Sequence, residues 1–298
     1  MAIGTELSAL PASVRLEPGR GGLPRVVVDA SFARAEVYLQ GAHVTSWTPA
    51  GADEVIWMSD RSDFAPGAPL RGGVPICFPW FGPDPAGAGP MHGIARISDW
   101  VLAGAVEHAD RVVLTFTLES ADAAGVVLDD VRFSFVYTVT IGCRLTLALS
   151  VTNAGIRSLH YEEALHTYLA IGDVHRARVL GLGGTERLDR LTSTVTCLPI
   201  GTEIQLTGET DWVLTQPGVI TVADLADGRA VDVAADGSAN AVVWNPWIDK
   251  AAAMRDFGDD EWERMVCVET CNVLGAALDL APGATRKMEV QISTRPLT

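Results

Sequence analysis

The feature of this sequence that most constrains its fold is an alternation of apolar and polar residues with a period of two. It is clearest at residues 35–40, 111–118, 132–139 and 144–151, which are rich in Val, Thr and aromatic side chains. Successive side chains of a strand point to opposite faces of a sheet, so this pattern predicts strands with one buried face. Other stretches that predict strands lie at 203–207, 218–222, 240–244, 265–269 and 286–292. The chain holds roughly 15 such segments, separated by Gly, Asp or Asn.

No long stretch of the sequence shows the 3.6-residue period of an amphipathic helix. Many short strands at this spacing predict an all-β fold, and we expect a large antiparallel β-sandwich rather than βαβ units. The sequence contains no internal repeat, no low-complexity tract and no obvious linker. We therefore expect residues 1–298 to form a single domain.

The overall charge restricts the partners that this chain can bind. The sequence has 22 Lys and Arg against 37 Asp and Glu, a net charge of −15. Nucleic acids and anionic membrane surfaces are bound by basic proteins, so neither is an expected partner. No apolar run reaches transmembrane length, and residues 1–7 lack the basic start of a signal peptide. These features predict a cytoplasmic protein, and a monomer is the default expectation.

The cysteines indicate a reduced protein. Their number is odd and no two form a CxxC pair; they are Cys77, Cys143, Cys197, Cys267 and Cys271. An odd number without a metal-binding spacing is typical of free thiols rather than of disulfides or a zinc site. We expect all five to be plain buried or half-buried thiols.

One segment of the chain reads neither as a helix nor as a regular strand. It runs RGGVPICFPWFG over residues 71–82 and is followed by HGIAR over 92–96. Pro removes backbone donors and Gly admits unusual backbone angles, so a rigid loop carrying aromatic side chains is expected. Arg71 and Arg96, at its two ends, are placed to direct positive charge into one pocket. Alternatively, each arginine caps a loop through backbone carbonyls.

Two titratable residues stand out against their apolar surroundings. His166 lies among residues that favour burial, and Glu269 follows the four apolar residues 265–268. A carboxylate at the end of an apolar strand should be partly desolvated, which raises its pKa toward the range of a general base. On spacing alone, a core histidine and a solvated strand-end glutamate remain the simpler interpretations.

Several separated motifs together resemble the glucose-6-phosphate 1-epimerase family, the phosphosugar branch of the aldose 1-epimerase superfamily. These motifs are the segments at 71–82 and 92–96, QGAHVTSW at 40–47, ALHTY at 164–168, VWNPW at 243–247 and MVCVE at 265–269. The resemblance covers about residues 25–292, with the motifs in the family's order. It implies a β-supersandwich related to galactose mutarotase and catalysed exchange of the α and β anomers of hexose 6-phosphates.

The resemblance also assigns roles to individual residues. It implies that Glu269 is the base at the C1 hydroxyl and that His166 is the acid at the ring oxygen, with no cofactor or metal. Arg71 and Arg96 fall at substrate-binding positions, which we interpret as a phosphate clamp. Asp189 is expected to contact the sugar, although a loop aspartate without a role is nearly as good an interpretation.

The remaining residues of the predicted site are less specific. His92 either orients the substrate or braces its loop. Trp80, Phe81 and Trp247 either line the sugar or pack in the core, and Arg61 is a weaker third cation that reads as a surface residue. One departure from the family pattern is Met91, where the family often carries glutamine, and it leaves one sugar or phosphate contact open.

The sequence leaves three functions of different kinds open. The first is the phosphohexose mutarotase, with glucose 6-phosphate as the expected substrate. The second is an epimerase of unphosphorylated aldoses, in which Arg71 and Arg96 are structural. The third is a carbohydrate-binding protein without activity, which would have no need of His166 and Glu269. A glycosidase is disfavoured because it normally needs two carboxylates that flank the scissile bond.

Overall fold

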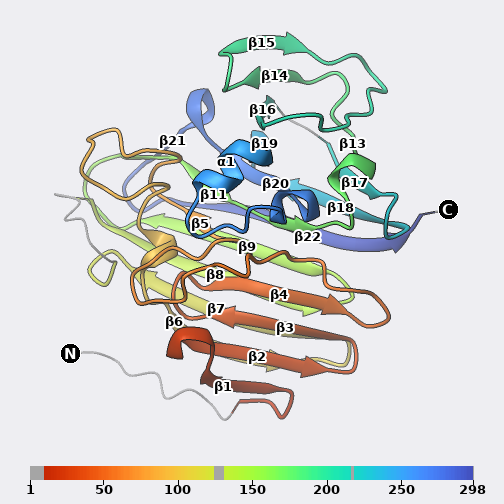
Figure 1. Cartoon of the computed structure of the whole chain (residues 1–298). Helices are drawn as coiled ribbons and strands as arrows, with labels where there is room; N and C mark the ends of the chain where they lie inside the picture. The colour runs from red at the N-terminus through yellow and green to blue at the C-terminus, as the bar shows by residue number, and fades with distance from the viewer. Residues whose placement is uncertain (1–9, 124–130, 216–217, 298) are drawn as a thin grey trace, which may run out of the picture.

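The computed structural model describes residues 10–123, 131–215 and 218–297 (Figure 1). The expectation about a signal peptide rests on residues 1–7 and lies outside this part. The described chain forms 22 strands, in sheets paired antiparallel, and one α-helix, α1 (Trp247–Ala253). This confirms the all-β prediction. Among the described helices, none is long and apolar enough to cross a membrane.

One large sheet carries the motifs at 164–168, 243–247 and 265–269. Its strands lie in the order β15 (Thr194–Cys197), β14 (Glu186–Asp189), β16 (Thr210–Thr215), β19 (Asn240–Asn245), β20 (Met265–Asn272), β11 (Glu163–Leu165) and β5 (Ile76–Cys77). A further strand, β12 (Tyr168–Ala170), also pairs with β20. Figure 1 shows that β14 and β15 project at the top of the molecule.

The second large sheet contains the clearest alternating segments. Its order is β13 (Ala177–Leu180), β17 (Ile220–Asp224), β18 (Arg229–Asp236), β22 (Thr285–Pro296), β9 (Leu145–Asn153), β8 (Phe133–Gly142), β7 (Arg111–Glu119) and β6 (Val101–Glu107). In β7, Val112, Leu114 and Phe116 are fully buried while the residues between them are partly exposed. The period-two pattern thus places one face of this sheet in the core.

Two smaller sheets complete the fold. The first has the order β1 (Val14–Pro18), β2 (Pro24–Ala30), β3 (Ala33–Tyr38) and β4 (His43–Pro49), and the second pairs β10 (Leu159–Tyr161) with β21 (Leu278–Leu280). The N-terminal sheet lies at the bottom of Figure 1, at the opposite end from β14 and β15.

Phe78 joins the rigid loop at 71–82 to the core between the two large sheets. It follows β5, and its ring lies 4.9 Å from the ring of Phe133 and 4.7 Å from that of Phe135, both edge to face. The two partners belong to β8 of the other large sheet. Edge-to-face aromatic pairs add to the free energy of burial, so this anchor fixes the loop against the sandwich.

Two of the strand predictions need correction. Residues 203–207 do not form a strand, because only Ile204 makes a bridge, to Val179. Glu269 does not end its strand either, since β20 continues to Asn272 with every residue buried. The carboxylate therefore lies in the middle of the sheet, which desolvates it more than a strand end would.

The cysteines are all free, as expected, but their burial divides them. Cys77, Cys267 and Cys271 are buried, whereas Cys143 and Cys197 are exposed. The prediction of buried or half-buried thiols is thus wrong for the last two.

Glu163 provides a test of how the fold responds to pH. Its Oε1 accepts a hydrogen bond of 2.9 Å from Nδ2 of Asn272, on the neighbouring strand. Burial raises the pKa of Glu163 from 4.5 to about 7, against the opposing effects of Asn272 and Arg286. A carboxyl whose folded pKa is raised stabilises the fold below its unfolded pKa, and this contribution is lost as the pH rises through the folded pKa.

We expect Glu163→Gln to remove this pH dependence. The difference in the free energy of unfolding between the variant and the wild type should increase, in favour of the variant, on the order of 3 kcal/mol between pH 4 and pH 8. Urea unfolding of both proteins across this range measures the difference. Parallel stability curves would show that the pKa of Glu163 is the same in the folded and the unfolded protein.

Candidate active site

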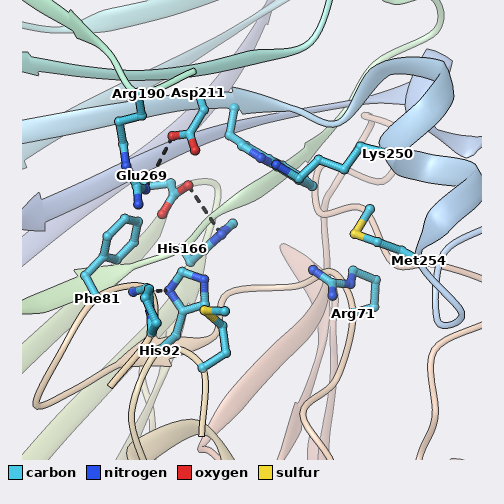
Figure 2. Close-up of a pocket in the computed structure, with 13 residues that line it drawn as sticks. Arg71, Phe81, His92, His166, Arg190, Asp211, Lys250, Met254 and Glu269 are labelled. Carbon is cyan, nitrogen blue, oxygen red and sulfur yellow. Dashed lines mark hydrogen bonds and ion pairs between the residues drawn. The ribbon is translucent and has the colours of Figure 1, made fainter. Parts of the chain in front are cut away.

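A cavity of about 300 Å³ lies against the sheet that contains β19 and β20 (Figure 2). Its lining comes from three strands, from α1 and from five connecting segments. The residues are Arg71, Phe81, Gly82, Pro83, Met91, His92, His166, Arg190, Asp211, Trp244, Lys250, Met254 and Glu269. Figure 2 shows His166 and Glu269 near the centre, with Phe81 and His92 on one side and Arg71, Lys250 and Met254 on the other.

The strand register brings His166 and Glu269 together. Both β11 and β12 pair with β20, so that Leu165 lies opposite Thr270 and Tyr168 lies opposite Cys267. The two residues between β11 and β12 must therefore pass beside Glu269. His166 Nε2 lies 3.3 Å from Glu269 Oε1, and the side chains are 8% and 1% exposed.

Burial disfavours the charged form of both members of this pair. It raises the pKa of Glu269 well above its usual value; the nearby Asp211 raises it further, and Arg190 opposes the rise. It also lowers the pKa of His166 well below the usual value, with further lowering by His92 and two arginines. The opposite shifts favour the state in which both members are neutral and the pair holds one titratable proton, which is the proton that an acid–base pair exchanges.

Each residue also keeps a polar atom for another partner. Glu269 Oε2 and His166 Nδ1 are buried, and neither has a hydrogen-bond partner within the described residues. A buried polar atom without a partner is costly. A ligand in the cavity with hydroxyl groups could satisfy the carboxylate oxygen.

Arg71 lies on the lining, as predicted for a residue that binds an anion. Its Nε donates to Asp256 Oδ2 at 3.1 Å and its Nη1 donates to the Tyr168 hydroxyl at 3.1 Å. Burial lowers the pKa of Arg71, but Tyr168 and Asp256 outweigh it and keep the guanidinium charged. The guanidinium is thus fixed in place with its charge partly balanced.

Arg96 lies behind the lining rather than on it. It is a buried residue of the 3₁₀ turn Ala95–Ile97, and its Nη2 donates to the Met91 carbonyl at 2.6 Å. This is the loop-bracing contact that the sequence left open as the alternative. Direct contact between Arg96 and phosphate stays a prediction, although its charge helps to lower the pKa of His166.

His92 combines the two interpretations that the sequence left open. Its Nδ1 accepts a hydrogen bond from the Gly82 amide at 3.2 Å, and its ring packs edge to face on Phe81 at 4.8 Å. It therefore braces the loop. Its ring also lies 5.5 Å from that of His166 on the lining, where it can meet a substrate.

Asp189 does not lie on the lining of the cavity, and its contact with the sugar stays a prediction. Its side chain instead accepts hydrogen bonds from Trp212 Nε1 at 3.2 Å and from the Leu191 amide at 2.9 Å. The aspartate on the lining is Asp211, on β16. Asp189 lies opposite Trp212, the neighbour of Asp211, in the β14–β16 register.

Of the other residues that the sequence singled out, Phe81 and Met91 line the cavity, whereas Trp80, Trp247 and Arg61 do not. Trp80 Nε1 donates to the Pro90 carbonyl, and Trp247 packs on Trp262 with ring centroids 4.4 Å apart. Arg61 is a surface residue, as expected, and pairs with Asp259 at 3.0 Å. The tryptophan that lines the cavity is Trp244, three residues before the predicted one.

Several residues of the lining were not predicted from the sequence. They are Arg190, Asp211, Trp244, Lys250 and Met254. Trp244 lies within the motif at 243–247, so this motif could have located it. Asp211 lies directly opposite Trp244, but only in the β16–β19 register. That register is not visible in the sequence.

Cys267 extends the central pair into a possible set of metal ligands. One ligand atom each from His166, Cys267 and Glu269 lies within 4.8 Å of the others. Burial raises the pKa of Cys267 well above its usual value, and a protonated thiol is a poor metal ligand. The proposed ring opening needs no metal ion, and the metal-free site stays a prediction.

Comparison with known proteins identifies the family. The sequence model described as aldose 1-epimerase matches residues 24–293. The chain belongs to the aldose 1-epimerase family. This agrees with the resemblance carried by the motifs.

Individual members of the family extend the match over nearly the whole chain. A Salmonella typhimurium protein provisionally named glucose-6-phosphate 1-epimerase is 34% identical over 275 residues, which are 89% of this chain and 90% of that protein. An Escherichia coli protein of the same provisional name is 34% identical over 257 residues, 83% of each chain. The crystal structure of a protein from Salmonella typhimurium, provisionally named a mutarotase, superposes with a TM-score of 0.90 at 30% identity, covering 97% of this chain and 96% of that one.

Proposed function

We propose that this epimerase-family protein is an isomerase that interconverts the α and β anomers of hexose 6-phosphates, with glucose 6-phosphate as the first expected substrate. The observation that carries the proposal is the buried His166–Glu269 pair, 3.3 Å apart, on the lining of a cavity that also presents Arg71. The names of the most similar relatives support a phosphorylated sugar as the substrate.

The reaction needs a base at the C1 hydroxyl and an acid at the ring oxygen, which are both attached to C1. Glu269 takes the proton of the C1 hydroxyl while the bond between C1 and the ring oxygen breaks, which leaves an aldehyde at C1. His166 gives a proton to the departing ring oxygen. After rotation about the C1–C2 bond, the same two groups act in reverse and the ring closes on the other face. Each proton returns to its donor, so Glu269 and His166 end in the protonation states in which they began.

This mechanism fixes the protonation state in which the pair is active. The pair must hold one proton, and in the active form this proton lies on His166 while Glu269 is ionised. Adding a second proton removes the base, and losing the last one removes the acid. The rate should therefore follow a bell-shaped dependence on pH, with both limbs belonging to the pair rather than to one residue.

Recognition of the phosphate needs local positive charge, because the protein as a whole carries a net charge of −15. Arg71 and Lys250 supply two cations on the side of the lining away from Phe81 (Figure 2). Arg71 is the proposed phosphate ligand, because its planar guanidinium suits phosphate oxygens and its position is fixed by Asp256. The sugar ring then lies between Arg71 and the aromatic wall formed by Phe81.

We also propose that the protein acts as a single domain, as a monomer in the cytoplasm, and without a cofactor or metal. The shared hydrophobic cluster supports one domain, since it includes residues of both large sheets. The acidic composition supports a small-molecule substrate rather than a nucleic acid or a membrane as the partner.

Polarimetry of freshly dissolved sugars tests the proposed activity. The pure α anomer of glucose 6-phosphate should approach its equilibrium rotation much faster with the protein than without it, and glucose should gain far less. Equal acceleration of both sugars would instead identify a broad aldose epimerase. No acceleration of either, together with measurable sugar binding, would leave a carbohydrate-binding protein.

A further inference from the structure

Arg190 connects two walls of the cavity. It directly follows β14, and its backbone amide donates to the Asp211 carbonyl at 2.9 Å. Its Nη1 lies 3.4 Å from Asp211 Oδ1, while the guanidinium carbon lies 5.5 Å from the ring centroid of Phe81. Arg190 is thus fixed by a backbone hydrogen bond, by the ion pair of its guanidinium and by the contact with the Phe81 ring.

The loop opposite Arg190 leaves room for this arrangement. A Cβ atom added at Gly82 would lie 3.6 Å from Arg190 Nη2, so any longer side chain there would compete with the guanidinium for space. Gly82 has φ of +85°, a region in which side chains are strained. The glycine therefore suits both the turn of the loop and the approach of Arg190.

The charges around Glu269 give this contact a consequence for the proposed reaction. Asp211 is an acidic neighbour that raises the cost of ionising Glu269, and Arg190 is the cation that opposes it. Figure 2 shows Arg190 and Asp211 directly beside Glu269. The other titratable groups that face Glu269 come from β5, the β11–β12 connection, β12 and β20: Cys77, His166, Tyr168, Cys267 and Cys271. Among these neighbours Arg190 is the permanent cation, since a guanidinium is not deprotonated in proteins.

We propose that Arg190 is a positioning residue, which holds Asp211 against the Phe81 wall and places a positive charge beside Glu269. The inference rests on the proposed mutarotase function. It assigns Arg190 to the acid–base machinery rather than to the phosphate site, and Arg190 acts through Asp211 and Glu269 without touching the reacting atoms.

Charge-changing variants at the two positions should move the pH–rate profile in opposite directions. Removing a cation makes each nearby protonation easier, so Arg190→Gln should shift the whole bell to higher pH. Asp211→Asn should shift it to lower pH, and Arg190→Lys should leave it close to that of the wild type. We also expect Arg190→Gln to lower kcat at the optimum on the order of tenfold, well short of the 10²–10⁴-fold effect of losing a general base.

Two further measurements separate this role from the alternatives. If Arg190 binds the phosphate instead, Arg190→Gln will raise KM for glucose 6-phosphate but not for glucose, with an unmoved pH profile, and the proposal is wrong. An unchanged profile with unchanged kinetics also overturns it. Carbon-13 NMR titration of the glutamate carboxyl groups gives a readout independent of activity, since Glu269→Gln identifies the signal by its loss. The Glu269 signal should titrate at higher pH in Arg190→Gln, even if the wild type proves inactive on phosphohexoses.

Discussion

Replacing Glu269 by glutamine should lower the rate of catalysed anomer exchange by about 10²–10⁴-fold, because an amide cannot take the proton of the C1 hydroxyl. The change keeps the size of the side chain and one oxygen for His166 Nε2, which lies 3.3 Å from the wild-type carboxylate. Because the carboxyl group is buried and its pKa is raised, its neutral replacement should leave the protein at least as stable as the wild type near neutral pH. Rates measured with saturating glucose 6-phosphate, alongside urea unfolding, test both parts.

Glu163→Gln is the matched control for this substitution. Glu163 is also a buried glutamate with a raised pKa, and it lies on β11, next to β20, but it does not line the cavity. Its variant should retain the wild-type rate. Similar losses in both variants would trace the effect to the sheet rather than to the base, and a Glu269→Gln protein of nearly full activity would exclude Glu269 from the mechanism.

Replacing Arg71 by alanine should weaken the use of glucose 6-phosphate far more than that of glucose. Hydrogen bonds between charged groups contribute about 1.5–3 kcal/mol each, so losing the guanidinium should raise KM for the phosphosugar on the order of 10²-fold. KM for glucose should change only a few-fold, since the acid–base pair remains. Steady-state kinetics with the two sugars measures the ratio.

The ion pair of Arg71 requires two controls. Alanine leaves Asp256 without its partner at 3.1 Å, so the double variant Arg71→Ala with Asp256→Asn separates loss of the phosphate ligand from an unpaired carboxylate. Arg61→Ala removes another arginine of this region, which pairs with Asp259 outside the cavity, and it should have no effect on either sugar. Equal losses for glucose and glucose 6-phosphate in Arg71→Ala would mean that Arg71 supports the site but does not recognise phosphate.

The alternating strands were predictable from the sequence, because one face of each is buried and the other is not. The pattern at β7 shows this directly, with Val112, Leu114 and Phe116 in the core. Strand β20 is different, since all eight of its residues are buried. The alternating pattern does not predict a titratable residue inside a fully buried strand. The pattern therefore predicts a strand that ends at Glu269, whereas β20 continues to Asn272.

The central pair of the site could be predicted from its motifs, but the rest of the lining could not. Asp211 and Asp189 lie on neighbouring strands, and only the register of β14, β16 and β19 decides which of them faces the cavity. Arg96 illustrates a second limit. Its direction depends on a turn that points the guanidinium at the Met91 carbonyl, which residue type and spacing do not reveal. The sequence can supply the residue types of a site, whereas the register and the loop geometry select among them.

The most direct test of the proposed function is magnetisation transfer between the α and β anomeric protons of glucose 6-phosphate at equilibrium. This NMR measurement observes the exchange itself and needs no coupling enzyme. We predict fast transfer for glucose 6-phosphate with the wild-type protein, little for glucose, and loss of the transfer with Glu269→Gln. Transfer at the uncatalysed rate with a folded wild-type protein would contradict the proposed mutarotase function.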